Sequence, residues 1–175
     1  CWSDDNRNHV TLIDFGLSQK YISDGIHMEY RADKKRMHEG TIEFTPIDCH
    51  QGFRVSARGD MEIFGYVLLN WLGKLPWIDL TKDMKKSNFA SVANEIAKIK
   101  NSFIGRTEQG ADSDQALVAA QNLCESCGCC DEFMIKYFQY IYCLSYQEQP
   151  DYQCLSDIFF SYQDYIKLLM VVNRE

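Results

Sequence analysis

The segment "SARGDMEIFGYVLLNWLG", from Ser56 to Gly73, is apolar on nearly every side when it is written as a helix. A helix without a broad polar face is stable only where neighbouring elements cover it all round. Ser56 can cap the start of this helix and Gly73 can end it. The segment therefore predicts a central, buried helix. Its apolar residues are Met61, Ile63, Phe64, Val67, Leu68, Leu69, Trp71 and Leu72.

Helical spacing of apolar residues also predicts elements after the central helix. We expect an amphipathic helix over 82–103, with Phe89, Val92, Ile96 and Ile99 on one stripe, and shorter helices over 115–125 and 131–146. Asp151 can cap a last helix that carries Leu155, Ile158, Tyr162, Ile166 and Leu169. Residues 10–13 read as a buried strand, residues 22–40 as a loop and residues 104–114 as a surface loop. One mostly helical domain with a few short strands near its start follows.

Charge and composition exclude several classes of protein. The net charge is −7, from 25 acidic against 18 basic residues, which argues against a general nucleic-acid binder and is compatible with a basic protein partner. The most apolar run, residues 166–172, falls far short of the roughly 20 residues that span a membrane. Eight cysteines without an even framework favour a reducing, intracellular compartment. The chain opens on Cys1 and not on Met, so we expect its beginning to be a break.

The stretch "VTLIDFGLSQKY", from Val10 to Tyr21, places Asp14, Phe15 and Gly16 between two strand-like runs. In protein kinases this element carries the Asp that holds Mg²⁺ on the ATP phosphates. The tripeptide alone is a weak signal. Its context is specific, because "GTIEFTPID", "RGDMEIFGY", "LPW" and "LSYQEQPDYQCLSDIF" follow in that order.

Together these segments resemble the C-terminal lobe of protein kinases of the casein kinase I group, nearest to the vaccinia-related kinases. The resemblance is close from Val10 to Trp77, moderate over 133–165 and poor over 78–132, where we expect an insertion at about 104–131. It implies that residues 1–175 are part of a two-lobed kinase domain with an activation segment over 14–48. It further implies ATP and Mg²⁺ as cofactors, Ser/Thr phosphoryl transfer to protein substrates that include basic chromatin proteins, and a nuclear or cytoplasmic location.

The resemblance also implies roles for individual residues. Asp14 would coordinate Mg²⁺, Phe15 would pack in the inter-lobe core, and Gly16 would let the backbone turn. The hydroxyl of Thr41 would bond the catalytic Asp and so position the substrate hydroxyl. Asp60 would accept backbone N–H groups of the catalytic loop, which agrees with the need of a buried carboxylate for donors. The floor under the substrate would be formed by Phe44, Thr45, Pro46, Ile47 and Asp48.

Several parts of a working kinase are missing from the sequence. It contains no G-x-G-x-x-G loop and no H-x-D-x-K-x-x-N catalytic loop, so we expect the base Asp upstream of Cys1. Asp4 and Asp5 lie too close to Asp14 for that role and read as turn residues. We therefore expect the 175 residues alone to be inactive and, since the helix that covers the central helix is also missing, marginally stable or prone to aggregate.

Two other interpretations stay open. A pseudokinase or regulatory interaction domain would keep this lobe without phosphoryl transfer, although the presence of Asp14, Gly16 and Thr41 favours an active parent. The cluster "CESCGCC", Cys124 to Cys130, contains half of a zinc motif, but buried free thiols are the simpler interpretation. The four histidines are far apart in the sequence, so we expect polar loop or turn residues at His9, His27, His38 and His50.

Overall fold

A computed structural model describes residues 2–3, 6–10, 13–129 and 131–172 of the chain, and the side chains within residues 13–129 and 131–162. The short strands come first, as β1 (Trp2–Ser3), β2 (Asn6–Val10), β3 (Ile22–Ser23) and β4 (Ile26–His27). The helices are α1 (Ile47–His50), α2 (Ala57–Leu72), α3 (Phe89–Phe103), α4 (Ser113–Ser126), α5 (Glu132–Cys143) and α6 (Tyr152–Val172), with 3₁₀ helices η1 (Lys34–Arg36) and η2 (Ile78–Thr81). The prediction of a mostly helical lobe with short strands near its start is confirmed.

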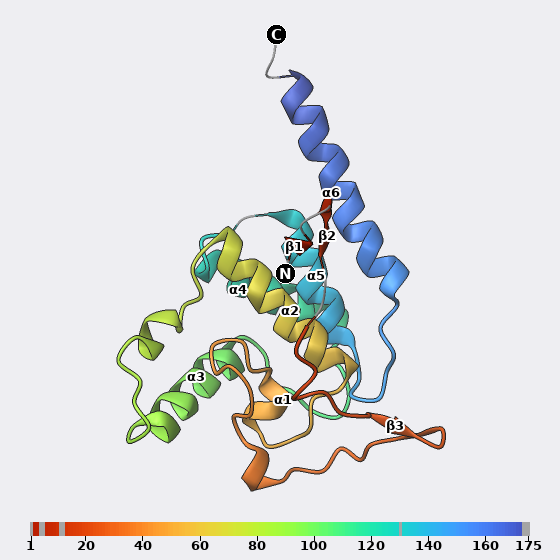
Figure 1. Ribbon diagram of the computed structural model, residues 1–175. Helices are drawn as coiled ribbons and strands as arrows, with labels where there is room; N and C mark the ends of the chain where they lie inside the picture. The colour runs from red at the N-terminus through yellow and green to blue at the C-terminus, as the bar shows by residue number, and fades with distance from the viewer. Residues whose placement is uncertain (1, 4–5, 11–12, 130, 173–175) are drawn as a thin grey trace.

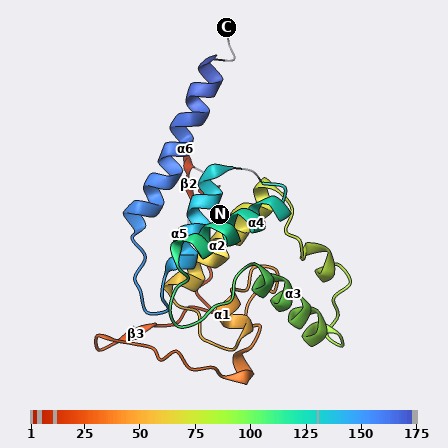
Figure 2. The ribbon, with the colours of Figure 1, turned by 180° about the vertical axis from the view of Figure 1, so that it is seen from behind.

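The helices α2, α4 and α5 form the centre of the molecule, and α3 lies to one side of them (Figure 1). Seen from behind, the β3–β4 hairpin projects from the body near α1, while α6 extends away from it towards the C-terminus (Figure 2). Within the described part of the chain, no helix combines the length and the apolar character that a membrane span requires.

The central helix is where the sequence predicts it, but its burial is one-sided. Gly73 ends α2, and its N–H donates to Leu69 O at 2.8 Å. Ser56 precedes the helix, but its side chain forms no cap hydrogen bond. The apolar pattern alone predicts cover on every side, but Phe64, Trp71 and Leu72 have exposed fractions of 44%, 74% and 45%, which agrees with the expectation that part of this helix lacks its cover. One face of α2 is therefore an exposed apolar surface.

The buried face of α2 packs closely on α5. A Cβ atom added to Gly65 would lie 2.6 Å from the Phe138 ring and 2.8 Å from the Tyr137 ring, closer than real Cβ contacts. The Tyr137 hydroxyl donates to Met61 O at 2.7 Å, which fixes the two helices in register. The ring of Tyr66 from α2 is fully buried against Phe138 and Trp77. The absence of a side chain at Gly65 thus sets how near the two helices lie.

The segment before α1 differs from the prediction in two places. The expected strand over 10–13 reaches only Val10 within the described residues, because residues 11–12 lie outside them and Ile13 is 55% exposed without strand structure. The expected loop over 22–40 contains the β3–β4 hairpin, whose turn residues Asp24 and Gly25 both have positive φ. An Asp-Gly pair is a strong hairpin signal, so the hairpin could have been predicted from the sequence.

The later helices and loops follow the prediction less closely at their ends. Helix α3 begins at Phe89 rather than at residue 82, because turns and irregular backbone occupy residues 82–88, directly after η2. Helix α5 ends at Cys143 and not at residue 146. The expected surface loop over 104–114 is anchored in the interior, since Ile104 and Arg106 are only 8% and 6% exposed. Asp151 does cap the last helix, because its Oδ1 accepts from the N–H groups of Gln153 and Cys154.

Helix α4 lies within the segment expected to be an insertion, and it packs mainly on α5 through small buried residues. Asp112 caps it, because Oδ1 accepts from Asp114 N at 3.1 Å and from Gln115 N at 3.0 Å. We expect Asp112→Ala to lower the free energy of unfolding by about 1 kcal/mol, the typical cost of a lost N-cap. Urea denaturation followed by circular dichroism measures this change. Asp114→Ala is the matched control, since the side chain of Asp114 caps nothing among the described residues; an equal loss in both variants would contradict the assignment of the cap.

Candidate functional site

Asp14, Phe15 and Gly16 lie on the surface, in a turn that follows the β1–β2 hairpin. Asp14 has a left-handed backbone, with φ of 64°, and its Oδ1 accepts from Gly16 N at 3.2 Å. The rest of its carboxylate is exposed, so it fits the role of one oxygen ligand of Mg²⁺, an ion that takes most of its other ligands from water and phosphates. Phe15 is 66% exposed. Described residues do not supply the inter-lobe packing implied for Phe15, and that role stays a prediction.

A cavity of about 570 Å³ joins this turn to the start of α2. Gly16 lines it from the first segment, Gly40 from the activation segment, and Ser56 and Asp60 from α2 and its N-cap. Asp60 is exposed at the rim, and its carboxylate accepts no hydrogen bond from a described residue; desolvation of the carboxyl group nevertheless raises its pKa. The Ser56 hydroxyl is buried and has no partner within the described residues. The cavity is thus lined by polar groups, among them Ser56 and Asp60, together with apolar side chains such as Ile63.

The five residues expected to form the substrate floor, Phe44 to Asp48, follow the cavity-lining Gly40 in the chain and are half-buried or buried. Thr45, Ile47 and Asp48 are at most 2% exposed, so their side chains support the floor from beneath. The Thr45 hydroxyl donates to Glu39 O and Thr41 O, both at 3.1 Å. The side chain of Thr41 is exposed. Thr41 is therefore accessible next to a turn whose backbone is fixed from below.

A buried ion pair holds Asp48 at the end of the floor. The guanidinium of Arg58 donates from Nε and Nη2 to the two carboxylate oxygens of Asp48, both at 2.8 Å, and neither side chain is exposed. The remaining N–H groups of Arg58 donate to backbone carbonyls of Thr107 at 2.7 Å and Leu144 at 3.0 Å. A two-point pair of this kind combines strength with a fixed geometry. It ties the floor, α2 and the loop before α4 together.

A second buried carboxylate, Glu62 of α2, has partners in three elements. Its Oε1 accepts from Ile47 N at 3.1 Å and from the Tyr66 hydroxyl at 2.7 Å. Its Oε2 accepts from Arg106 Nη2 at 3.2 Å. Arg106 also donates to the carbonyls of Ile141 and Tyr142 at the end of α5. Because Glu62 bonds the backbone of the floor directly, it links the floor to the core of the lobe.

The structure brings two of the histidines together. His38 Nδ1 and His50 Nδ1 are 2.8 Å apart, so the expectation that the histidines do not cluster is wrong for this pair. His50 is 2% exposed and lies in α1, and it is not a loop residue. Burial lowers the pKa of His50 to about 2, with the nearby Lys100 adding to the effect. His50 is therefore neutral at physiological pH.

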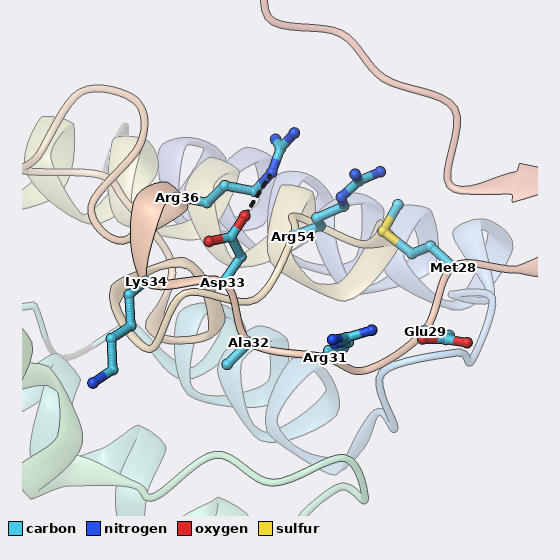
Figure 3. Close-up of a pocket in the computed structure, with 8 residues that line it drawn as sticks. All are labelled: Met28, Glu29, Arg31, Ala32, Asp33, Lys34, Arg36 and Arg54. Atoms are coloured by element: carbon cyan, nitrogen blue, oxygen red, sulfur yellow. Dashed lines mark ion pairs between the residues drawn. The ribbon is translucent and has the colours of Figure 1, made fainter.

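A second cavity, of about 480 Å³, opens beside the activation segment (Figure 3). Arg31, Lys34 and Arg36 line it from the segment between β4 and α1, and Arg54 joins them from the segment before α2. Asp33 lies 3.9 Å from Arg36, the pair marked by the dashed line in Figure 3. These basic residues are half-buried or exposed, which agrees with a solvated basic face on an otherwise acidic protein.

The cysteine cluster has the properties of buried thiols. Cys124, Cys127 and Cys129 are at most 4% exposed, and Cys129 Sγ lies 3.6 Å from Asp131 Oδ2. Burial raises the pKa of Cys127 to about 11, so its thiol is protonated at neutral pH. Among the residues that the structure describes, no three His, Cys, Asp or Glu side chains are placed to hold a metal ion; Cys130 lies outside that part.

The structure thus brings the segment of Asp14, the loop before Thr41 and Asp60 to one cavity, and the individual roles of these residues stay predictions. The sequence analysis missed the buried supports, Arg58, Glu62, Lys100 and Arg106. Two of them gave a signal, because Arg58 and Glu62 are charged residues in an otherwise apolar helix, and a buried charge needs partners. Lys100 gave a weaker one, since it lies four residues after Ile96 at the edge of the apolar stripe, and Arg106 gave none, since it lies in a polar loop.

Comparison with known proteins relates the sequence and the fold to a family. Serine/threonine-protein kinase VRK2 of Homo sapiens is 34% identical over 154 residues, which span 87% of this chain and 27% of that protein. The B1 kinase of Monkeypox virus is 33% identical over 148 residues, 84% of this chain and 43% of that protein. The solved structure of vaccinia related kinase 3 superimposes with a TM-score of 0.70 and 25% identity, over 95% of this chain and 46% of that one.

No protein-family model matches the sequence. The chain spans less than half the length of each of these relatives, and the superimposed fold is a helical lobe. The order of the motifs, from the turn at Asp14 to the buried α2, agrees with that match. These relatives and this fold identify the chain as a C-terminal kinase lobe of the vaccinia-related type.

Proposed function

We propose that this lobe serves Ser/Thr phosphoryl transfer from ATP to protein substrates, as part of a two-lobed kinase. One observation carries the proposal: a single cavity of about 570 Å³ is lined by the turn after Asp14, by Gly40 next to Thr41, and by Asp60. These are the places where a kinase positions its metal, its substrate and its catalytic loop. The relatives named as serine/threonine-protein kinases support it.

Each residue has a role that its geometry permits. When bound, Mg²⁺ would neutralise charge on the transferring phosphates. Asp14 presents an exposed carboxylate that can hold the ion, and its hydrogen bond from Gly16 N fixes its orientation. Thr41 presents an exposed hydroxyl beside the cavity, where it can orient a catalytic carboxylate supplied by residues outside the described part. The carboxylate of Asp60 accepts no hydrogen bond from a described residue, so it can accept hydrogen bonds from backbone N–H groups of a catalytic loop.

The acceptor is proposed to be a protein hydroxyl, with basic or chromatin-associated proteins as the substrate class and the nucleus or cytoplasm as the location. The net charge of −7 supports a basic partner. The basic pocket of Figure 3 is not where such a partner would bind, because its lining has four basic and two acidic residues. A basic substrate would instead contact the acidic remainder of the surface.

Phosphate transfer from labelled ATP tests the proposal directly. The assay compares the 175-residue chain with the complete product of its gene, using histones and an acidic protein as acceptors, in the presence and absence of Mg²⁺. We expect Mg²⁺-dependent transfer by the complete product, faster to histones, and none by the 175 residues alone. Absence of transfer from every form would overturn the proposal and favour a regulatory interaction domain.

A further inference from the structure

Lys100 of α3 is a charged residue at a buried position, with only 1% of it exposed. Its Nζ lies 3.0 Å from Glu43 O, 2.6 Å from Thr45 O and 3.4 Å from His50 Nε2. An ammonium group has three protons to donate, so these three acceptors satisfy it completely. The rings of Tyr66 and Trp77, 4.6 Å and 4.8 Å from Nζ, add cation–π attraction.

Two of these acceptors belong to the backbone under the proposed peptide site. Glu43 immediately precedes the substrate floor, and Thr45 lies within it. The Trp77 indole N–H also donates to Glu43 O, at 2.8 Å, so that carbonyl is held from two sides. No other described side chain donates to Thr45 O. Lys100 is therefore the side chain that determines where this part of the floor lies.

The third acceptor connects Lys100 to a histidine nearer the surface. If His50 Nε2 accepts from the ammonium of Lys100, the His50 proton is on Nδ1 and is donated to His38 Nδ1. If Lys100 is a neutral amine, it accepts from His50 Nε2–H, and His50 Nδ1 accepts from His38 Nδ1–H. In passing between these states, one proton moves from Lys100 to His50 while another moves from His50 to His38. The half-buried His38, which also bonds Asn94, then carries the charge.

We propose that Lys100 is a positioning residue for the substrate floor, and that His50 and His38 connect its proton to solvent so that the floor is held more tightly in acid than in base. This proposal rests on the proposed function for the role of the floor. Charge-assisted hydrogen bonds from the ammonium are roughly twice as strong as neutral ones, so loss of the proton loosens Thr45.

The electrostatic surroundings place this change near neutrality. Burial lowers the pKa of Lys100 to about 7, against the opposing influence of the facing Glu62, Glu43 and Cys49. His50 is faced by Lys100 and His38, and stays neutral with a pKa lowered to about 2. Partial burial lowers the pKa of His38, with the Asn94 side chain acting against it. Of Lys100, His50 and His38, Lys100 is thus the first to bind a proton as the pH falls from the basic side.

Hydrogen exchange tests the positioning role without any need for kinase activity. We expect Lys100→Met to speed exchange of the floor amides Phe44 and Thr45, which bond Thr41 O, by about 10-fold, while α5 amides keep their rates. Lys98→Met, an exposed change on the same helix, is the matched control. Unchanged floor exchange in Lys100→Met would overturn the positioning role.

Nitrogen NMR of the histidine rings tests the proton connection in the wild-type protein, so it does not depend on a variant that folds. Between about pH 6 and about pH 8, we expect the protonated ring nitrogen of His50 to change from Nδ1 to Nε2. The same protonated nitrogen at both pH values would overturn the connection.

The peptide KM of the complete gene product, where it transfers phosphate, should rise several-fold over the same range of pH, with kcat and the KM for ATP unchanged, and Lys100→Met should abolish that dependence. A pH-independent peptide KM in the wild type would overturn the coupling to substrate binding. A different outcome would separate the two proposals. If Lys100→Met speeds hydrogen exchange of the floor amides but no form of the protein transfers phosphate, the proposed function is wrong and the positioning role of Lys100 stands.

Discussion

Replacement of Asp14 by Asn in the complete gene product is expected to lower the rate of phosphoryl transfer on the order of 10³-fold, because a metal ion contributes several kcal/mol of charge stabilisation. Asn keeps the shape of the side chain and can still accept from Gly16 N, so the turn is preserved. What the variant loses is the negative charge that holds Mg²⁺. Steady-state assays at several Mg²⁺ concentrations measure the effect, and a higher Mg²⁺ requirement is expected alongside the lower rate.

Asp24→Asn is the matched control for this prediction. Asp24 is also exposed and also has a left-handed backbone, with φ of 52°, but it lies in the β3–β4 turn and away from the cavity. We expect its rate to stay within about twofold of the wild type, since a solvated turn carboxylate makes no contact with the reaction. Equal losses in both variants would show that surface charge matters and that Asp14 has no special role.

Arg58→Met is expected to lower the free energy of unfolding by about 3–5 kcal/mol, the usual cost of removing one partner of a buried ion pair. The change leaves Asp48 as a buried, unpaired carboxylate and leaves the carbonyls of Thr107 and Leu144 without their donor. Urea denaturation followed by circular dichroism gives the value. If the variant does not fold, we expect that no soluble protein is recovered.

Two further variants serve as comparisons for Arg58→Met. Arg36→Met removes a half-buried arginine whose pairs with Asp33 and Glu39 are 3.9 Å and 3.6 Å long, and it should lower the free energy of unfolding by less than about 1 kcal/mol. The double variant Asp48→Leu with Arg58→Met replaces the pair by apolar groups and should recover most of the lost stability. A double variant no better than Arg58→Met would mean that the bonds to the carbonyls, and not the charge on Asp48, dominate the cost.

The sequence predicted the helices well where a local signal marks an end. Gly73 and Asp151 lie where the sequence placed them, because a cap depends only on the few residues around it. The apolar pattern of α2 shows which faces can be covered and not which are, and the sequence analysis accordingly expected both a buried helix and a part of it without cover. Trp71 is apolar and 74% exposed for that reason.

The buried polar residues that support the floor could not be predicted from the sequence. Lys100 lies four residues after Ile96, so helical spacing places it beside the apolar stripe of α3, but the sequence does not show what its ammonium group would bond there. Its acceptors at Glu43 and Thr45 come from another segment, so only the tertiary structure makes a lysine favourable there. The same holds for His38 and His50, whose contact depends on the turn between them. Arg106 lies in a polar, glycine-containing stretch that predicts a loop and gives no sign of its buried partner Glu62.

The bonds of Glu62 to Ile47, Tyr66 and Arg106 also limit how this lobe can change during evolution. Replacement of Glu62 or Arg106 alone leaves the other charge buried without its ion-pair partner. A lineage that keeps the fold must therefore pass through a less stable intermediate or change both residues nearly together. Exposed positions such as Val118 carry no such restriction and can drift independently. Among homologous sequences, the identities at positions 62 and 106 should therefore vary as a pair.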